Sequence, residues 1–328
     1  MVKMRENKFF LPGGGQVPGE FVAGIEDNLR SDYRSREIPS SDLNSVLERV
    51  DFEWINHYLV DLAKRSGVEP SDVIVNREYF FNSRGLKNLE RRALGGYHSA
   101  SASVFVDADQ VVVQAKHLGV DTNLAFFDVI CHESVHAASR QEIINRLPQP
   151  EYSKICTLIE RFLVQAPFLG KKINLFPRSA VSGYEVTSHY ELAGGLGIKQ
   201  VFWERFDEAV TEKMSRQLFL DYFKHNPQLA GSKEVEFFIS NSWRETDGYS
   251  SSLRLLEILI SQISREAGVT TDTLWQGLIN GKLRGEKLLD GELNQLLDKF
   301  FPPEFWDRLA TAKNEQDMAN LAKDFLTG

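Results

Sequence analysis

Two histidines four residues apart constrain this chain more than any other feature. His132 and His136 enclose Glu133 in the pattern H-E-x-x-H. On an α-helix, residues four apart lie on one face, so both imidazoles can reach the same metal ion. Glu133 sits one step round the helix, close enough to take a proton from a water molecule on that metal. The pattern therefore predicts a helix that carries two metal ligands and a general base.

The residues around the motif predict a buried helix. Asp121, Thr122 and Asn123 offer N-cap oxygens at its start. Apolar side chains then cover nearly every side of the helix: Leu124, Phe126, Phe127, Val129, Ile130, Cys131, Val135, Ala137 and Ala138. Buried histidines and carboxylates need partners, and a shared Zn²⁺ ion is one that suits two imidazoles and a carboxylate. The alternative is a core helix whose histidines are satisfied locally.

A third ligand must come from elsewhere in the chain. In the extended metzincin pattern a third histidine follows, but Ser139 stands where that pattern has glycine and Glu142 where it has histidine. A glutamate on a later helix is the other arrangement. The segment D-E-A-V-T-E at 207–212 resembles the N-E-A-x-S-D segment that carries the third zinc ligand in gluzincins, the thermolysin-like zinc peptidases. The resemblance covers this segment and the H-E-x-x-H motif.

The resemblance implies a role for each of these residues. It makes Glu208 the third zinc ligand and Glu133 the general base, with Glu212 bonded to the free ring nitrogen of a zinc histidine. Asp207 replaces the Asn of the pattern and Glu212 replaces its Asp, so their supporting roles rest on altered side chains. An exposed helix face is the alternative for Glu208 and Glu212. The lesser candidates for the third ligand are Glu142, Glu185 and Glu191.

A zinc peptidase also needs a donor for the oxyanion that develops in the transition state. Gluzincins resemble one another in placing a Tyr or His after the metal helix for this purpose. On an ideal strand Tyr184 and Tyr190 share one face and His189 lies on the other. We predict Tyr184 ahead of His189, because the flexible Ser182-Gly183 approach can re-aim it. The alternative is an exposed loop with no catalytic part.

The expected fold class is α+β, in a zincin-like arrangement. A small twisted sheet, with strands near 97–106 and at 111–113, packs on the H-E-x-x-H helix, and its edge strand pairs with an extended substrate. A hairpin near 184–202 leads into the helix of Glu208, and a mostly helical C-terminal part follows. Outside the motif, we expect helices at 41–66, 150–166, 251–263, 271–282, 290–300, 303–313 and 315–326.

Three regions are expected along the chain. Residues 1–40 contain breakers such as Leu11-Pro12-Gly13 and predict a flexible or irregular N-terminal arm. Residues 41–225 hold the zincin-like catalytic domain. Residues 226–328 form a helical C-terminal subdomain.

Composition excludes some classes of protein. A net charge of −8 and a pI of about 5.5 argue against nucleic acid as a partner. With only Cys131 and Cys156, and Cys131 inside the motif helix, a disulfide framework is not expected. The sequence shows no signal-like apolar segment and no stretch of 18 apolar residues. We therefore expect no membrane span and a cytoplasmic location, with secretion without a signal peptide left open.

These features together favour a zinc-dependent peptidase that acts on a peptide or protein substrate. A related reading keeps the metal but gives it another hydrolytic substrate. The alternative from another class is a helical binding or scaffolding protein with a non-catalytic metal site or an accidental H-E-x-x-H. The sequence indicates no oligomeric state.

Overall fold

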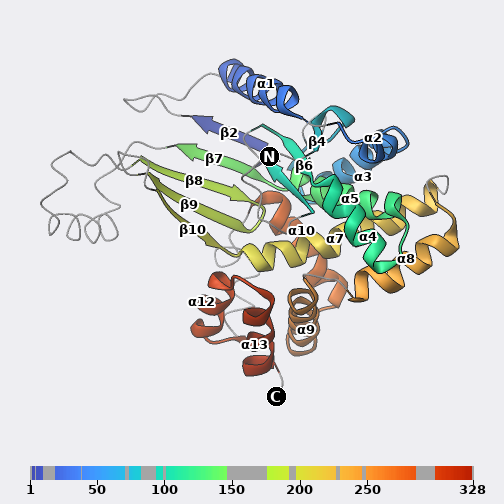
Figure 1. The fold of residues 1–328 in the computed structure, drawn as a ribbon. Helices are drawn as coiled ribbons and strands as arrows, with labels where there is room; N and C mark the ends of the chain where they lie inside the picture. Colours follow the sequence, from blue (N-terminus) through green and yellow to red (C-terminus); the bar gives the residue numbers. More distant parts are fainter. Residues whose placement is uncertain are drawn as a thin grey trace, which may run out of the picture.

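The computed structural model describes residues 2–3, 5–9, 19–37, 39–70, 74–82, 94–98, 101–145, 176–191, 197–226, 230–245, 249–285 and 300–326. Over these ranges the chain is an α+β protein, as expected. Figure 1 shows a broad sheet on one side, helices on the other, and helices α5 and α7 near the centre. None of the described helices is both long and apolar enough to cross a membrane.

The centre of the molecule is a pair of packed helices, α5 (Thr122–Ala138) and α7 (Glu204–His225). Asp121 caps α5 as expected, accepting hydrogen bonds from the backbone N–H groups of Asn123 and Leu124. The apolar side chains of α5 are buried on nearly all sides, and α7 buries Phe206, Leu218 and other residues in the same core. This packing holds the faces that carry the motif residues against each other.

A three-stranded sheet precedes α5 in the chain. Its order is β4 (Phe80–Asn82), β6 (Ser103–Val106) and β5 (Gly95–His98), with β5 antiparallel to β6 and in contact with α5. The single strand expected near 97–106 is therefore divided into the antiparallel pair β5 and β6. The strand expected at 111–113 is wrong, because these valines lie in helix α4 (Ala108–Leu118). Asp107 caps that helix and the left-handed Gly119 ends it, and these end signals outweigh the β-branched run.

A five-stranded sheet flanks the central helices. Its order is β10 (Gly197–Phe202), β9 (Glu185–Glu191), β8 (Phe176–Ser182), β7 (Gln141–Asn145) and β2 (Arg5–Phe9). Only β2 and β7 pair in parallel. The hairpin expected before the helix of Glu208 is present as β9 and β10, and β8 extends it where a loop was expected. The turn between β8 and β9 lies beside the start of α7.

The N-terminal residues correct the expectation of an irregular arm. Besides β2, they form β1 (Val2–Lys3), which pairs with β3 (Val68–Glu69), and helix α1 (Gly19–Arg36). The ring of Tyr33 in α1 lies edge-on to Phe105 of β6, at 5.0 Å between centroids. Helix α1 thus lies against the three-stranded sheet.

Most of the other helices differ from expectation at their ends, but the helix at Ser232–Glu245 was not among the individual helices expected. The helix expected at 41–66 is divided into α2 (Ser41–Leu47) and α3 (Phe52–Arg65), because Asp51 leaves the helix to cap the second segment. A short 3₁₀-helix (Arg77–Tyr79) follows. The later helices are α8 (Ser232–Glu245), α9 (Ser250–Ala267), α10 (Thr271–Arg284), α12 (Pro303–Thr311) and α13 (Glu315–Leu326). The helix expected at 150–166, and nearly all of that at 290–300, lie outside the described residues.

The C-terminal helices are part of the same packed structure. Helix α9 contacts α7, α10 and α13, and α12 contacts α7. The boundary expected at 225/226 therefore does not separate the central helix pair from the C-terminal part.

Candidate metal centre

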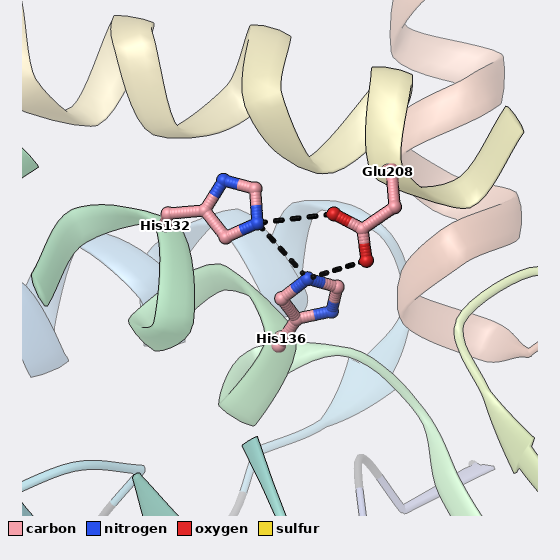
Figure 2. A group of neighbouring side chains, drawn as sticks. All are labelled: His132, His136 and Glu208. Carbon is pink, nitrogen blue, oxygen red and sulfur yellow. Dashed lines mark hydrogen bonds and ion pairs between the residues drawn. The ribbon is translucent and has the colours of Figure 1, made fainter. Parts of the chain in front are cut away.

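Helices α5 and α7 bring the three residues predicted as metal ligands together. The Nε2 atoms of His132 and His136 lie 3.2 Å apart. Glu208 places Oε2 at 3.2 Å from Nε2 of His132 and Oε1 at 3.3 Å from Nε2 of His136. Figure 2 shows the two rings, from α5, and the carboxylate, from α7, converging on one point. The three side chains offer ligand atoms that all lie within 4.8 Å of one another.

The size of this triangle fits a small divalent cation. Tetrahedral zinc with bonds of about 2.0–2.1 Å separates neighbouring ligand atoms by roughly 3.3 Å. The two imidazole nitrogens are 3.2 Å apart, and each lies 3.2–3.3 Å from a different oxygen of Glu208, so the spacing is close to that of such a site. Two imidazole nitrogens and one carboxylate are a donor set that zinc accepts, with a fourth position left for water or substrate. The residues fit the ion that the sequence predicts.

A carboxylate and a cation support His132 from behind. Glu212, one turn after Glu208, places Oε2 at 3.0 Å from Nδ1 of His132. Its Oε1 accepts a hydrogen bond of 2.7 Å from Nε of Arg216. The guanidinium of Arg216 lies 5.1 Å from the ring centroid of Trp243 in α8, and Nε1 of Trp243 donates to Asp128 of α5 at 3.1 Å. Such a bond from a carboxylate fixes the orientation of a ligand histidine.

A different carboxylate and cation lie behind His136. Oδ2 of Asp207 is 3.9 Å from Nδ1 of His136. The other oxygen, Oδ1, accepts hydrogen bonds of 2.7 Å from the backbone N–H of Tyr184 and 2.7 Å from Nζ of Lys282. Glu212 thus bonds the ring of one candidate ligand, whereas Asp207 lies near the other ring beyond hydrogen-bond distance.

Glu133 lies in the interior beside the ligands. Glu133 is only 4% exposed, and its Oε2 has no hydrogen-bond partner among the described residues. Burial raises the pKa of this carboxyl, and the charges of the two histidines lower it again in part. Strand β5 passes so close that a Cβ atom on Gly95 would lie 2.8 Å from Oε1 of Glu133. Glycine at 95 therefore lets the edge strand approach the general base that the sequence predicts.

The charges of the cluster shift its pKa values in opposite directions. Burial opposes the charge of Glu208, but the neighbouring histidines, above all His136, hold the pKa of its carboxyl well below the usual range. Burial likewise lowers the pKa of His132, but hydrogen bonds to Glu208 and Glu212 outweigh it and raise the pKa well above its usual value. A metal cation that binds here displaces protons from the imidazoles, so its affinity rises with pH.

The structure corrects the expectation for Tyr184. This residue is 3% exposed, and its hydroxyl donates a hydrogen bond of 2.8 Å to the carbonyl of Leu278 in α10. Its ring packs edge-on to Phe206, at 5.3 Å between centroids. The hydroxyl is thus bonded to the backbone of a neighbouring helix, and Tyr184 reaches the centre through its backbone N–H instead.

The phenol of another tyrosine, Tyr249, lies beside the candidate ligands. It lies just before α9, and its ring stacks on that of His132 with centroids 5.8 Å apart and planes inclined by 15°. The charge of Glu208, burial and a hydrogen bond to Glu208 together raise the pKa of the phenol well above its usual value. The phenol therefore keeps its proton and can donate. The sequence around Tyr249 does not indicate a residue of the metal centre, because only the packing of α9 on α7 brings it to the candidate ligands.

The remaining candidates are placed as follows. Glu185 accepts a hydrogen bond of 2.7 Å from the hydroxyl of Thr187 and does not join the ligand triangle. Burial and nearby carboxylates raise its pKa to about 7. His189 pairs with Arg178 and Lys199 in the sheet, and Glu142 and Glu191 lie in β7 and β9. The side chains of His189, Glu142 and Glu191 lie outside the part of the chain that the structure describes.

Comparison with known proteins adds no relative. No protein-family model, curated protein sequence or solved structure matches this chain.

Proposed function

We propose that this protein is a zinc-dependent peptidase of the gluzincin type, which hydrolyses peptide bonds with a metal-activated water. The observation that carries the proposal is the position of Glu133, a buried carboxylate with one oxygen that has no hydrogen-bond partner among the described residues, next to His132 in the group of three candidate metal ligands. A buried carboxylate oxygen without a partner is costly in a purely structural site. It is useful where a proton must be accepted.

The residues would divide the chemistry among them. His132, His136 and Glu208 hold the metal. When bound, zinc would supply a Lewis acid that polarises the scissile carbonyl and lowers the pKa of a water molecule. Glu133 accepts the proton of that water at Oε2 and returns it to the leaving amine.

Tyr249 is the donor that the proposal assigns to the developing oxyanion. Its phenol is protonated and hydrogen-bonds Glu208, so it lies beside the ligands already. A donor of this kind stabilises the transition state more than the bound substrate, because the negative charge is largest there.

The edge strand β5 supports a peptide as the substrate. It pairs with β6 on one side, and Gly95 brings it against Glu133. An extended peptide that added to this edge would have its backbone held next to the general base. Such strand addition is a common way to bind peptides independently of their side chains.

Zinc analysis and cleavage of a peptide library test the proposal together. We expect about one zinc per chain, cleavage by the wild type, and loss of nearly all turnover in Glu133→Gln with zinc retained, since only the proton acceptor is removed. Zinc binding without cleavage of any peptide would leave a non-catalytic metal site. Failure to bind zinc would favour a helical binding protein with an accidental motif.

A further inference from the structure

Helix α10 carries a lysine into the interior of the protein beside the candidate metal centre. The side chains of Lys282 and Asp207 are 0% and 1% exposed, and Nζ of Lys282 lies 2.7 Å from Oδ1 of Asp207. A lysine is almost never fully buried without a paired charge, because its ammonium loses all its hydration. The pair is therefore a specific feature of this site.

The contacts of Asp207 show what this pair does to the carboxylate. Lys282 and the backbone N–H of Tyr184 both bond Oδ1. Oδ2 has no hydrogen bond within the described part of the chain and lies 3.9 Å from Nδ1 of His136. Lys282 and the backbone N–H of Tyr184 thus hold the carboxylate by one oxygen, with the other 3.9 Å from the ring nitrogen of a candidate metal ligand.

The turn between β8 and β9 closes over the ion pair. Gly183 has a φ of +58°, and a Cβ atom there would lie 2.5 Å from Oδ1 of Asp207 and 2.8 Å from Nζ of Lys282. A side chain at this position would separate the two charges or displace them. The backbone N–H of Arg140, just after α5, also bonds the carbonyl of Lys282 at 3.4 Å. Lys282 therefore links α10 to the start of α7 through its side chain and to the region after α5 through its backbone carbonyl.

The sequence pattern gives the pair a chemical reason. Where this chain has Asp207, the gluzincin-like segment has Asn, a neutral amide that needs no counter-ion. A carboxylate in the same buried place carries a charge that must be balanced. Lys282, distant in the sequence, supplies the balancing charge.

We infer that Lys282 is a positioning residue of the metal centre, which holds Asp207 against His136 and so links the docking of helix α10 to metal affinity. The inference rests on the proposed function for the identity of the metal. It makes the C-terminal helices a condition for a tight zinc site, although all three ligands lie in α5 and α7. Lys282 acts through Asp207 and His136 and need not touch substrate.

Zinc affinity of the full chain, measured by competition with a chromophoric chelator, tests the inference. Lys282→Met should weaken zinc binding about 10–100-fold, the usual effect of losing a group that supports a ligand. Arg284→Met is the matched control, because it removes the same charge from the same helix. Its Nε, however, bonds the carbonyl of Ser66 at the end of α3, 2.8 Å away. A purely structural role for Lys282 would lower stability in both variants and leave both zinc affinities near that of the wild type.

A double variant shows whether Lys282 acts through Asp207. Asp207→Asn alone leaves a buried ammonium without its counter-ion next to a cation site, so we expect weaker zinc binding. The double variant Asp207→Asn with Lys282→Met removes both charges. We expect it to bind zinc at least about 10-fold more tightly than Asp207→Asn alone, an effect of the size usual for groups that support a metal ligand. This comparison decides the question even if Lys282→Met alone does not fold.

Two results would overturn the inference. One is a zinc affinity for Lys282→Met equal to that of Arg284→Met. The other is a double variant that binds zinc no better than Asp207→Asn. A wild-type chain that binds no zinc would overturn the proposed function itself, so the two failures can be told apart.

Discussion

Each candidate ligand histidine has a carboxylate beside its Nδ1, but the distance and the surroundings differ: Glu212 lies 3.0 Å from His132, and Asp207 lies 3.9 Å from His136. Behind His132 stand Glu212 and Arg216, whose side chains are 10% and 22% exposed. Behind His136 stand Asp207 and Lys282, at 1% and 0%. Each histidine has a carboxylate behind it, and each carboxylate has a cation. The cation on the His132 side, Arg216, is partly exposed and lies over the ring of Trp243. The cation on the His136 side, Lys282, is fully buried.

The difference in burial predicts which ion pair can lose one member with the smaller loss of stability. The Glu212–Arg216 pair is the more exposed of the two, so water can take the place of a lost partner at the Arg216 end. When one member of a buried pair is removed, the other is left as an uncompensated charge, which is strongly destabilising. We therefore expect the His136 side to be the rigid half of the centre and the His132 side to be the adaptable half.

The largest effect should come from removing either candidate ligand histidine, and the loss of zinc should be the same for both. His132→Ala and His136→Ala should each lose stoichiometric zinc, because three protein ligands are the minimum for a catalytic zinc site. Each should also lose the increase in melting temperature that zinc gives the wild type, since metal binding is linked to folding. Metal analysis and thermal unfolding with and without zinc measure both effects. Full zinc occupancy in either variant would show that the centre is wrongly assigned.

The second effect separates the two sides. Asp207→Ala leaves Lys282 buried without a partner and should cost about 3–5 kcal/mol in the free energy of unfolding. Glu212→Ala removes its bonds to His132 and Arg216 and should cost less, because the partly exposed Arg216 can turn to water. Urea unfolding of the zinc-free proteins measures the difference without interference from metal. Equal costs would mean that burial does not distinguish the two supports.

The third effect compares one tyrosine from each side. Tyr249→Phe keeps the ring on His132 and removes the hydroxyl, so kcat should fall about 100–1,000-fold, as when an oxyanion donor is lost. Zinc content and KM should change little, because the contact forms mainly in the transition state. Tyr184→Phe breaks the bond to Leu278 and should lower stability by about 1 kcal/mol, with kcat nearly unchanged. A larger loss of kcat in Tyr184→Phe would reverse the assignment.

The fourth effect concerns the pH dependence of stability on the His132 side. Burial and the charge of Glu212 raise the pKa of Asp128 from 3.8 to about 7, although Trp243 donates to it. A carboxyl with a raised pKa binds its proton more tightly in the folded chain. Its contribution to stability is therefore complete below about pH 4 and is lost as the pH rises through about 7.

Asp128→Asn should remove this dependence and keep an acceptor for Trp243. From pH 5 to 8 the wild type should lose stability relative to the variant, by no more than about 1.4 kcal/mol per pH unit. Unfolding in urea with a chelator present, at several pH values, gives the two curves. Parallel curves would mean that Asp128 titrates normally in the folded protein.

The sequence by itself determined the central part of the site. The H-E-x-x-H spacing, the Asp121 cap and the apolar surface of α5 are local features, and a helix follows from them directly. The segment around Glu208 indicated which later glutamate to examine, and α7 brings it to the two histidines. The same local logic identified most helices of the C-terminal part. It failed at 111–113, where helix-end signals outweighed β propensity.

The tertiary structure alone decided which side chains complete the centre. Tyr184 and Tyr249 are both tyrosines next to a helix or turn, and no local pattern tells which hydroxyl faces the ligands. Lys282 lies 75 residues from Asp207, and a lysine in an amphipathic helix ordinarily predicts a solvated position. Its burial depends on how α10, the β8–β9 turn and α7 pack together. Local spacing fixes residues within one helix, but contacts between helices depend on the shape of the whole core, and that is why these partners required the fold.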